Sequence, residues 1–249
     1  LPIKFTLRIL ATMLLESESN RVSISDWSNN VRKQSHAAYE LLRKADTYHK
    51  KPRGTQLASG FPNPKVGGGD ALKIEKSLNR FCNHFTTIVQ DDGQGRVTGM
   101  CAEMGFINVK CINGNCSVGL TNMGKKFAEL PSPVFDEKRI QKFSLSELER
   151  SFLIAYMQEN LVDDWKMMNK ILLWIKDGKD DTTKLDEIME QHYGPGSEYG
   201  FSETEYPTYK GGAMGRLTEL GLLGRTWENR TVRYKVNDFE YDKYMVKEQ

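Results

Sequence analysis

The stretches Gly99-Met-Cys-Ala-Glu-Met-Gly-Phe-Ile107 and Gly215-Arg-Leu-Thr-Glu-Leu-Gly-Leu-Leu223 match position by position at a constant offset of about 116 residues. Each has the apolar spacing of the last turns of a helix. A glycine then follows that can adopt the left-handed conformation of a helix cap, and two apolar residues begin an expected strand. The repeat predicts two copies of one structural unit in the chain.

Each copy of the repeat is followed by the pattern of a β-hairpin. In the first copy, residues 108–118 contain Asn113-Gly114, the pair most typical of a two-residue hairpin turn. In the second copy, residues 225–236 alternate in polarity on both sides of Glu228-Asn229. Both copies therefore predict the order helix, glycine cap, strand, turn, strand.

These motifs resemble parts of the winged-helix superfamily of DNA-binding proteins. Residues 217–223 together with 233–236 are similar to a recognition helix and its wing. Residues 119–130 contain Leu120-Thr-Asn-Met-Gly124, which resembles the step from strand to helix that closes the wing. The resemblance implies a mainly α fold with small β-hairpin wings (α+β), arranged as two tandem elaborated winged-helix domains.

We place the two domains at residues 1–133 and 134–249, with the change around Pro131-Ser-Pro133. Helical periodicity in the first domain covers residues 5–16, 25–45 with a break near Gln34-Ser35, and 71–90, and a long irregular loop covers 46–70. In the second domain, Ser144-x-x-Glu147 predicts a capping box. The first helix expected there ends near Val162. Three more are expected to cover residues 165–176, 183–192 and 208–220.

Composition allows a soluble DNA-binding protein but does not require one. The net charge of +2 and the pI near 8.3 are only mildly basic, so a nucleic-acid surface must come from local clustering. No apolar run has the ~18 residues of a membrane span, and the first fifteen residues lack the pattern of a signal peptide. We expect a cytoplasmic, nucleoid-associated protein. Because the first residue is Leu1, we expect the chain to be processed or a fragment.

The strongest candidate for DNA contact is the second hairpin. It carries Arg225, Arg230, Arg233 and Lys235, opposed only by Glu228. Matching parity predicts that two or three of Arg225, Arg233 and Lys235 share one strand face. Guanidinium groups suit phosphate oxygens and narrow minor grooves, whereas the alternative is a charged edge hairpin that resists aggregation.

The helix before this hairpin supplies a second set of candidates. Ala213, Met214, Leu217 and Leu220 are expected to face the core, which leaves Tyr209, Lys210, Arg216 and Glu219 facing outward. Three glycines, at 211, 212 and 215, each cost about 1 kcal/mol in a helix relative to alanine. Either close approach of a DNA backbone or close helix packing would explain them.

In the first domain, the matching helix is expected over residues 96–104. Arg96 would begin this helix and face a groove, and Lys110 would meet the DNA backbone. A further basic set, Lys50, Lys51 and Arg53, leads into the long loop. A solvated surface is the alternative for each of these residues.

Four cysteines do not make a disulfide framework. Cys111 and Cys116 are expected as an opposed cross-strand pair, which allows a disulfide or, together with Cys82, His84 or Cys101, a zinc site. The spacing is not that of a zinc motif, and we expect small buried thiols instead. We expect no metal and no cofactor. The P-loop, G-x-S-x-G, H-E-x-x-H and Rossmann motifs are all missing from the sequence, so we expect no enzyme activity in this chain.

These observations lead to one main hypothesis and two alternatives. We expect sequence-specific binding of double-stranded DNA, as in a transcription regulator, by a monomer or by a homodimer formed through residues 71–90. The arrangement is also similar to the recognition region of type IIS restriction enzymes, in which cleavage belongs to an additional domain. The third possibility is a winged-helix adaptor that binds proteins, which the acidic stretch 177–190 favours.

Overall fold

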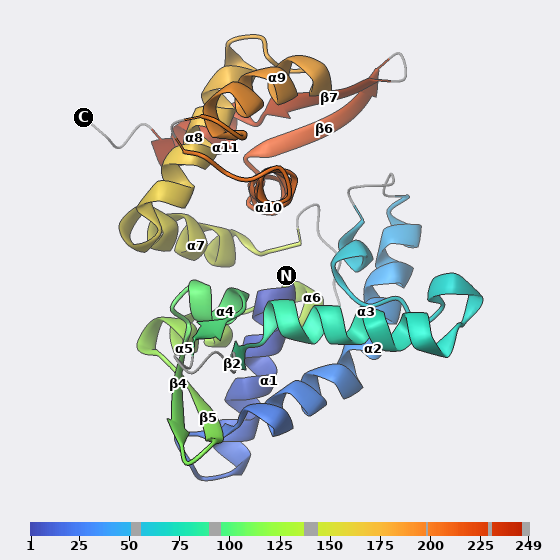
Figure 1. Cartoon of the computed structure of the whole chain (residues 1–249). Coiled ribbons are helices and arrows are strands. Elements are labelled where there is room, and N and C mark those ends of the chain that lie inside the picture. Colours follow the sequence, from blue (N-terminus) through green and yellow to red (C-terminus); the bar gives the residue numbers. More distant parts are fainter. Residues whose placement is uncertain (51–55, 90–95, 137–143, 198, 229–230, 246–249) are drawn as a thin grey trace. The chain divides into compact units, whose positions relative to one another are not determined.

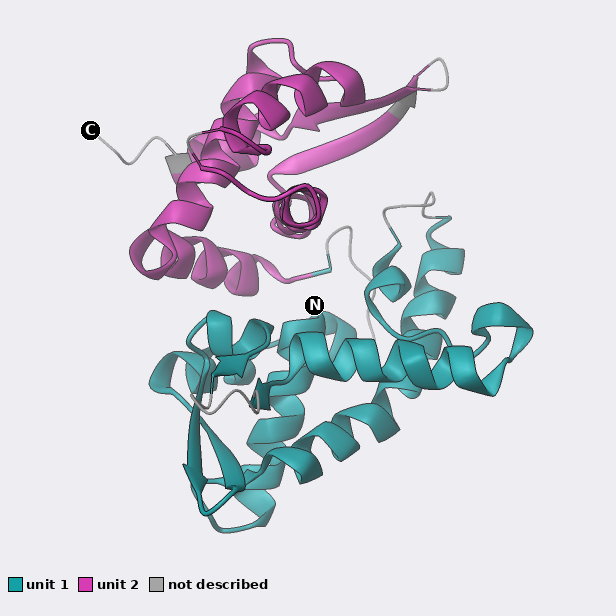
Figure 2. Ribbon diagram, viewed as in Figure 1, with its two compact units in different colours: residues 1–144 teal, residues 145–249 magenta. Residues whose placement is uncertain are grey.

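The computed structural model describes residues 1–50, 56–89, 96–136, 144–197, 199–228 and 231–245. The chain forms two compact units, residues 1–144 and 145–249, which are coloured separately in Figure 2. The boundary between the units therefore follows Ser144, later than the position after Pro133 that the sequence indicated. The fold is mainly helical with small antiparallel sheets. In the part of the chain described, no helix is both long and apolar enough to cross a membrane.

Unit 1 begins with three long helices and ends with a hairpin and two short helices (Figure 1). Its long helices are α1 (Pro2–Glu16), α2 (Ile24–Tyr48) and α3 (Ala71–Phe85), and two short 3-10 helices, η1 (Leu57–Gly60) and η2 (Val66–Gly68), lie between α2 and α3. The other elements are β1 (Val22–Ser23), β2 (Ile88–Val89), β3 (Val97–Thr98), α4 (Met100–Glu103), β4 (Ile107–Ile112), β5 (Asn115–Leu120), α5 (Asn122–Glu129) and α6 (Pro133–Asp136).

The main sheet of unit 1 has the order β1-β5-β4, with both pairs antiparallel. Asn113 and Gly114 form the turn between β4 and β5, and both have positive φ (50° and 79°), as a type I′ turn requires. This confirms the hairpin that the Asn-Gly pair predicts. Ile107 and Val118 on the hairpin are buried with Phe106, Trp27 and Leu7 in the core of the unit.

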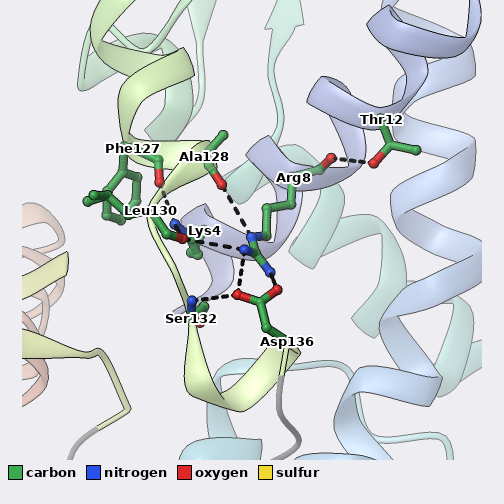
Figure 3. Close-up of polar contacts among 8 residues, drawn as sticks. All are labelled: Lys4, Arg8, Thr12, Phe127, Ala128, Leu130, Ser132 and Asp136. Carbon is green, nitrogen blue, oxygen red and sulfur yellow. Dashed lines mark hydrogen bonds and ion pairs between the residues drawn. The ribbon is translucent and has the colours of Figure 1, made fainter. Parts of the chain in front are cut away.

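A buried lysine joins α1 to the end of α5 (Figure 3). Lys4 is fully buried, and its ammonium donates to the carbonyl oxygens of Phe127 and Leu130. Arg8, one turn later, donates to the carbonyl of Ala128 at 3.2 Å and forms a two-pronged ion pair with Asp136. The last carbonyls of a helix have no partner within the helix, so these two cations stabilise the C-terminal end of α5.

Unit 2 contains five helices and one hairpin in the described part of the chain. They are α7 (Glu147–Asn160), α8 (Val162–Lys176), α9 (Thr182–Tyr193), α10 (Glu205–Glu219), β6 (Leu223–Glu228), β7 (Thr231–Val236) and α11 (Asp238–Met245). The strands β6 and β7 pair antiparallel, and Asp181 bridges to Arg233 of β7. The core contains Ile154, Met168, Ile171, Leu185 and Leu217, all nearly inaccessible.

The two units repeat one structure at the offset that the sequence predicts. Strands β4 and β5 become β6 and β7, and α5 becomes α11, when 116 is added to every residue number. Gly105 and Gly221, also 116 apart, both cap a helix with positive φ (65° and 75°). The pairing with the second hairpin strand also repeats, because Ser23 of β1 pairs with Ser117, and Asp181 forms an isolated bridge with Arg233, 116 residues after Ser117.

The hydrogen bonds around the glycine cap repeat as well. Thr121 donates its hydroxyl to the carbonyl of Gly105 at 2.9 Å, and Asn237 donates its amide to the carbonyl of Gly221 at 3.0 Å. Gly124, in the segment that follows β5, has no room for a side chain, since a Cβ would lie 1.9 Å from the carbonyl oxygen of Phe106. The close packing of α5 on the glycine cap therefore requires this glycine.

The units differ in the segment between the residue that pairs with the second hairpin strand and the glycine cap. This segment runs 82 residues from Ser23 to Gly105, but only 40 residues from Asp181 to Gly221. In unit 1 it contains all of α2, all of α3, and the β2–β3 pair. Helix α3 is therefore part of an enlargement that unit 2 lacks.

Three boundaries differ from those that the sequence indicated. Helix α2 is continuous from Ile24 to Tyr48, with no break at Gln34 and Ser35, because Ser35 is buried in its packed face. Helix α3 ends at Phe85 rather than at residue 90, and β2 follows. The capping box uses Ser146 and Glu149, which have the same spacing as Ser144 and Glu147 but lie two residues later.

Candidate nucleic-acid interface

Helix α10 leads into the β6–β7 hairpin and buries one face in unit 2. Tyr206, Ala213 and Leu217 are buried on that face, and Leu220 follows them at the C-cap. The helix contacts α8, α9 and β6. Of the four residues that the sequence predicts to face the core, Ala213, Leu217 and Leu220 are buried, whereas Met214 is only half-buried.

The residues of α10 that are open to solvent are Glu205, Pro207 and Thr208 in its first turn and two glycines further along the helix. Gly211 and Gly215 are exposed, and a Cβ built at either position would have no neighbour within 4 Å. Packing within unit 2 therefore does not require glycine at these two positions. Two exposed glycines one helical turn apart leave the backbone of α10 accessible to another molecule.

The polar candidates of α10 are held by carboxylates of neighbouring helices instead of pointing freely outward. Asp164 of α8 accepts hydrogen bonds from the Tyr209 hydroxyl and from Arg216 Nη2, both at 3.1 Å. Lys210 donates to Asp186 of α9 at 2.6 Å. The side chains of Lys210 and Arg216 are only 27% and 25% exposed. Both cations are therefore partly covered and paired with carboxylates, instead of extending freely into solvent.

The same carboxylates affect the tyrosines of this helix. Burial and the nearby charge of Asp164 raise the pKa of Tyr209 to about 12. Burial and the charges of Asp186 and Glu190 raise the pKa of Tyr206 to about 12 as well. Both tyrosines therefore stay protonated at neutral pH, and Tyr209 acts as a hydrogen-bond donor to Asp164.

The β6–β7 hairpin has one covered face and one exposed face. Pairing sets Leu223 opposite Val236 and Arg225 opposite Tyr234, so these four residues share the face that turns toward the core. Thr226 pairs with Arg233, and Gly224 pairs with Lys235, on the other face. Arg233 and Lys235 share a face as predicted, but Arg225 is on the opposite face. Because odd-numbered residues of β6 pair with even-numbered residues of β7, a shared parity in the sequence does not place Arg225 on the face of Arg233.

The cations of this hairpin differ in how far they are neutralised. Arg233 Nη1 lies 2.8 Å from Asp180 and 3.6 Å from Asp181, whereas Arg225 and Lys235 are exposed. Burial raises the pKa of Tyr234, and the adjacent charge of Arg225 opposes that shift. Arg230 lies outside the described residues. Arg225 and Lys235 are thus the hairpin residues that the structure leaves available for an anionic partner.

The candidates in unit 1 do not form one surface. Arg96 precedes strand β3, and only residues 100–103 are helical, so the predicted helix over 96–104 is wrong for its first four residues. The short α4 cannot start earlier because Val97 and Thr98 pair with β2. Lys110 is exposed on β4, and Lys50 is exposed with a positive φ of 48° just after α2. Lys51 and Arg53 lie outside the described residues.

Charge is unevenly divided between the two units. Residues 1–144 contain 21 Lys and Arg against 13 Asp and Glu, a formal surplus of +8. Residues 145–249 contain 14 against 20, a formal charge of −6. The small net charge of the chain therefore hides a basic unit 1 and an acidic unit 2.

A row of cations on α3 was not among the sequence-based candidates. Lys73, Lys76, Arg80 and His84 are exposed and lie on the helix face opposite the buried Leu78, Phe81 and Cys82. We call Lys73, Lys76 and Arg80 the α3 stripe. The spacing i, i+3, i+7 is visible in the sequence once residues 71–85 are treated as a helix.

The four cysteines fall into two classes. Cys111 and Cys116 face each other on β4 and β5 and form a disulfide on the exposed part of the hairpin, so the expectation of buried thiols is wrong for this pair. Cys82 and Cys101 are buried free thiols, as expected. Burial raises the pKa of both, that of Cys101 to about 12. Among the described residues, no three His, Cys, Asp or Glu side chains are grouped to hold a metal ion.

Comparison with protein-family models, curated proteins and solved structures found no match to the chain.

Proposed function

We propose that this chain binds double-stranded DNA through two tandem winged-helix units. The arrangement of the repeated unit supports the fold assignment. Each unit has a helix, a second helix, a glycine-capped helix and a hairpin, and the residue before the second helix pairs with the second hairpin strand, as strand β1 in unit 1 and as an isolated bridge in unit 2. This order places a helix and a hairpin next to each other, as a protein that contacts a groove and its flanking phosphates requires.

The charge of unit 1 is the observation that carries the proposal. A formal surplus of +8 in 144 residues produces a positive field that attracts a polyanion and releases its counterions on binding. The net charge of the whole chain conceals this surplus. The basic residues of unit 1 would supply most of the affinity, whereas the sequence alone pointed to unit 2.

Unit 2 would contribute close contacts with the DNA more than it would contribute positive charge. Arg225 and Lys235 are the exposed cations of its hairpin, and Gly211 and Gly215 open the backbone of α10. An exposed helix backbone lets a phosphate or sugar approach more closely than any side chain would permit. We therefore assign α10 and the hairpin of unit 2 to contacts that position the DNA.

A second candidate function, protein binding by unit 2, is supported by a different observation. Unit 2 has a formal charge of −6, and Asp164 and Asp186 neutralise the cations of α10. Phe239 on α11 is 78% exposed and Leu148 on α7 is 60% exposed. An acidic unit with exposed apolar side chains fits a protein adaptor, and its binding would depend only weakly on salt.

Titration of a fluorescent 30-base-pair duplex with the full chain at low salt tests the DNA proposal. We expect saturable binding, and we expect the double variant Arg225→Gln/Lys235→Gln to bind more weakly. The matched control is Lys166→Gln/Lys179→Gln, which removes two other exposed charges from unit 2. No saturable binding by the unmodified chain would refute the proposal. An equal loss of DNA affinity in both variants would show that the hairpin makes no specific contribution to DNA binding.

A further inference from the structure

Helix α3 presents its cations in a straight row on the outer surface of unit 1. Lys73, Lys76 and Arg80 follow the spacing i, i+3, i+7, which brings side chains to one face of a helix. The buried residues Leu78, Phe81 and Cys82 fix the opposite face against the core of the unit. The orientation of the α3 stripe is therefore set by packing, and its three side chains are exposed.

The charges of the α3 stripe are scarcely neutralised within unit 1. Lys73 has one carboxylate at 3.8 Å, that of Asp70, and this carboxylate also caps the helix. In the part of the chain that the structure describes, Lys76 and Arg80 form no ion pair. The one acidic residue within the helix, Glu75, is held by Arg32 of α2 at 2.7 Å. The stripe therefore presents nearly its full charge to solvent.

The cations of α10 in unit 2 have the opposite environment. Asp186 and Asp164 bind Lys210 and Arg216 within 3.1 Å and leave only about a quarter of each side chain exposed. Exposed cations without carboxylate partners destabilise a fold only where they lie close enough to repel one another. A fixed row of free cations is useful where an extended anion supplies the missing counter-charge.

The length of the stripe suits the backbone of a nucleic acid. Seven residues separate Lys73 from Arg80, a rise of about 10 Å at about 1.5 Å per residue. One strand of duplex DNA places a phosphate about every 3.4 Å along its axis, so a row of this length faces about three phosphates. The number of cations matches the number of phosphates within their reach.

We infer that the α3 stripe is a phosphate-binding surface that clamps the backbone of duplex DNA without reading its sequence. The inference rests on the proposed DNA-binding function and assigns most of its electrostatic component to α3. Helix α3 belongs to the enlargement that unit 2 lacks, so this surface exists once in the chain. Contact with phosphates holds the duplex on unit 1, while the hairpins and α10 remain available for groove contacts.

The test compares two triple variants of the full chain on a random-sequence duplex over a salt series. One variant removes the stripe, as Lys73→Gln/Lys76→Gln/Arg80→Gln. The matched control, Lys33→Gln/Lys44→Gln/Lys126→Gln, removes three exposed helical lysines elsewhere in unit 1. Both keep good helix-forming residues, and circular dichroism with thermal unfolding verifies that each variant folds.

For the stripe variant, we expect at least about tenfold weaker binding at low salt and a loss of about 0.9 in the slope of log K against log salt for each phosphate contact removed. The control should keep a slope close to that of the unmodified chain. If the unmodified chain binds and the stripe variant keeps its slope, the inference is overturned and the proposed function stands. If the unmodified chain does not bind at low salt, the proposed function itself fails.

Discussion

Arg216 of α10 donates a 3.1 Å hydrogen bond to Asp164 of α8, and the same carboxylate oxygen accepts the hydroxyl of Tyr209. One acidic residue thus holds two of the side chains that the sequence of α10 offers for DNA contact. An arginine in an ion pair has to exchange one anion for another before it binds phosphate. The electrostatics of α10 therefore depend on Asp164 as much as on the helix itself.

Asp164→Asn should strengthen DNA binding. The substitution removes a negative charge and leaves Arg216 with a weaker, neutral acceptor, so the guanidinium can turn toward phosphate. We expect severalfold tighter binding at low salt and a salt slope steeper by up to about 0.9, the value of one phosphate contact. Fluorescence anisotropy with duplex DNA measures both quantities.

The adjacent Asp163 provides the control for this variant. Its side chain is fully exposed and lies 3.8 Å from Lys166. Asp163→Asn removes the same charge without releasing Arg216. Equal gains in both variants would show that general charge, and not the Arg216–Asp164 pair, limits binding by α10.

Gly211→Ala/Gly215→Ala should stabilise the protein and weaken its DNA binding. A Cβ at either site meets no atom of the protein within 4 Å, and alanine is favoured over glycine in a helix by about 0.5–1 kcal/mol per site. The added methyl groups would, however, occupy the surface where DNA is proposed to approach. Chemical denaturation measures the first effect and anisotropy the second. A stabilised variant with unchanged affinity would show that the glycine face does not contact DNA.

Asp136→Asn should destabilise unit 1 near neutral pH and have little effect in acid. A hydrogen bond from Arg8 holds the pKa of the Asp136 carboxyl below its ordinary value. A lowered pKa in the folded state means that the carboxylate stabilises the fold above its unfolded pKa of about 3.9. That contribution is lost as the pH falls through the folded pKa. The effect should be modest, since the Asp136 side chain is 41% exposed.

Urea denaturation at pH 7, 5 and 3 checks this dependence. The difference in unfolding free energy between the unmodified chain and Asp136→Asn should be largest at pH 7 and shrink toward pH 3. Asp163→Asn serves again as a control, because it removes the charge of a fully exposed carboxylate. A difference that persists unchanged at pH 3 would assign the effect of Asp136→Asn to packing instead of charge.

The cysteines should react with a maleimide in two classes. Before reduction, Cys82 and Cys101 are the free thiols, and both are buried with raised pKa values, so labelling at pH 7 should be slow. After mild reduction, Cys111 and Cys116 on the exposed hairpin should label quickly. Mass spectrometry of labelled peptides distinguishes the classes. Rapid labelling of Cys111 before any reductant is added would contradict the disulfide.

The sequence predicts the repeated part of each unit well because local signals decide it. Gly105 and Gly221 cap helices, and Asn113-Gly114 forms a tight turn, since few other residues adopt the positive φ that these positions need. The buried face of α10 follows from apolar spacing alone. Each of these features depends on residues close together in the chain.

Features that depend on distant residues could not be obtained in this way. Which residues share a face of the β6–β7 hairpin depends on the register between its two strands, and Arg225 pairs with Tyr234 and so lies on the face opposite Arg233. Asp164 lies 45 residues before Tyr209, so nothing in the local pattern of α10 shows that its polar side chains are held. The α3 stripe has a regular spacing, but the division of the chain into units was needed to show that it lies on the basic one.

The most direct test of the account is the salt dependence of binding between the unmodified full chain and a random-sequence duplex. The account predicts that log K falls linearly with log salt concentration, with a slope near −0.9 for each phosphate contact and therefore beyond about −2.7 for the α3 stripe alone. Binding that does not change with salt, or no binding at 50 mM salt, would contradict the claim that cations on this protein hold DNA phosphates.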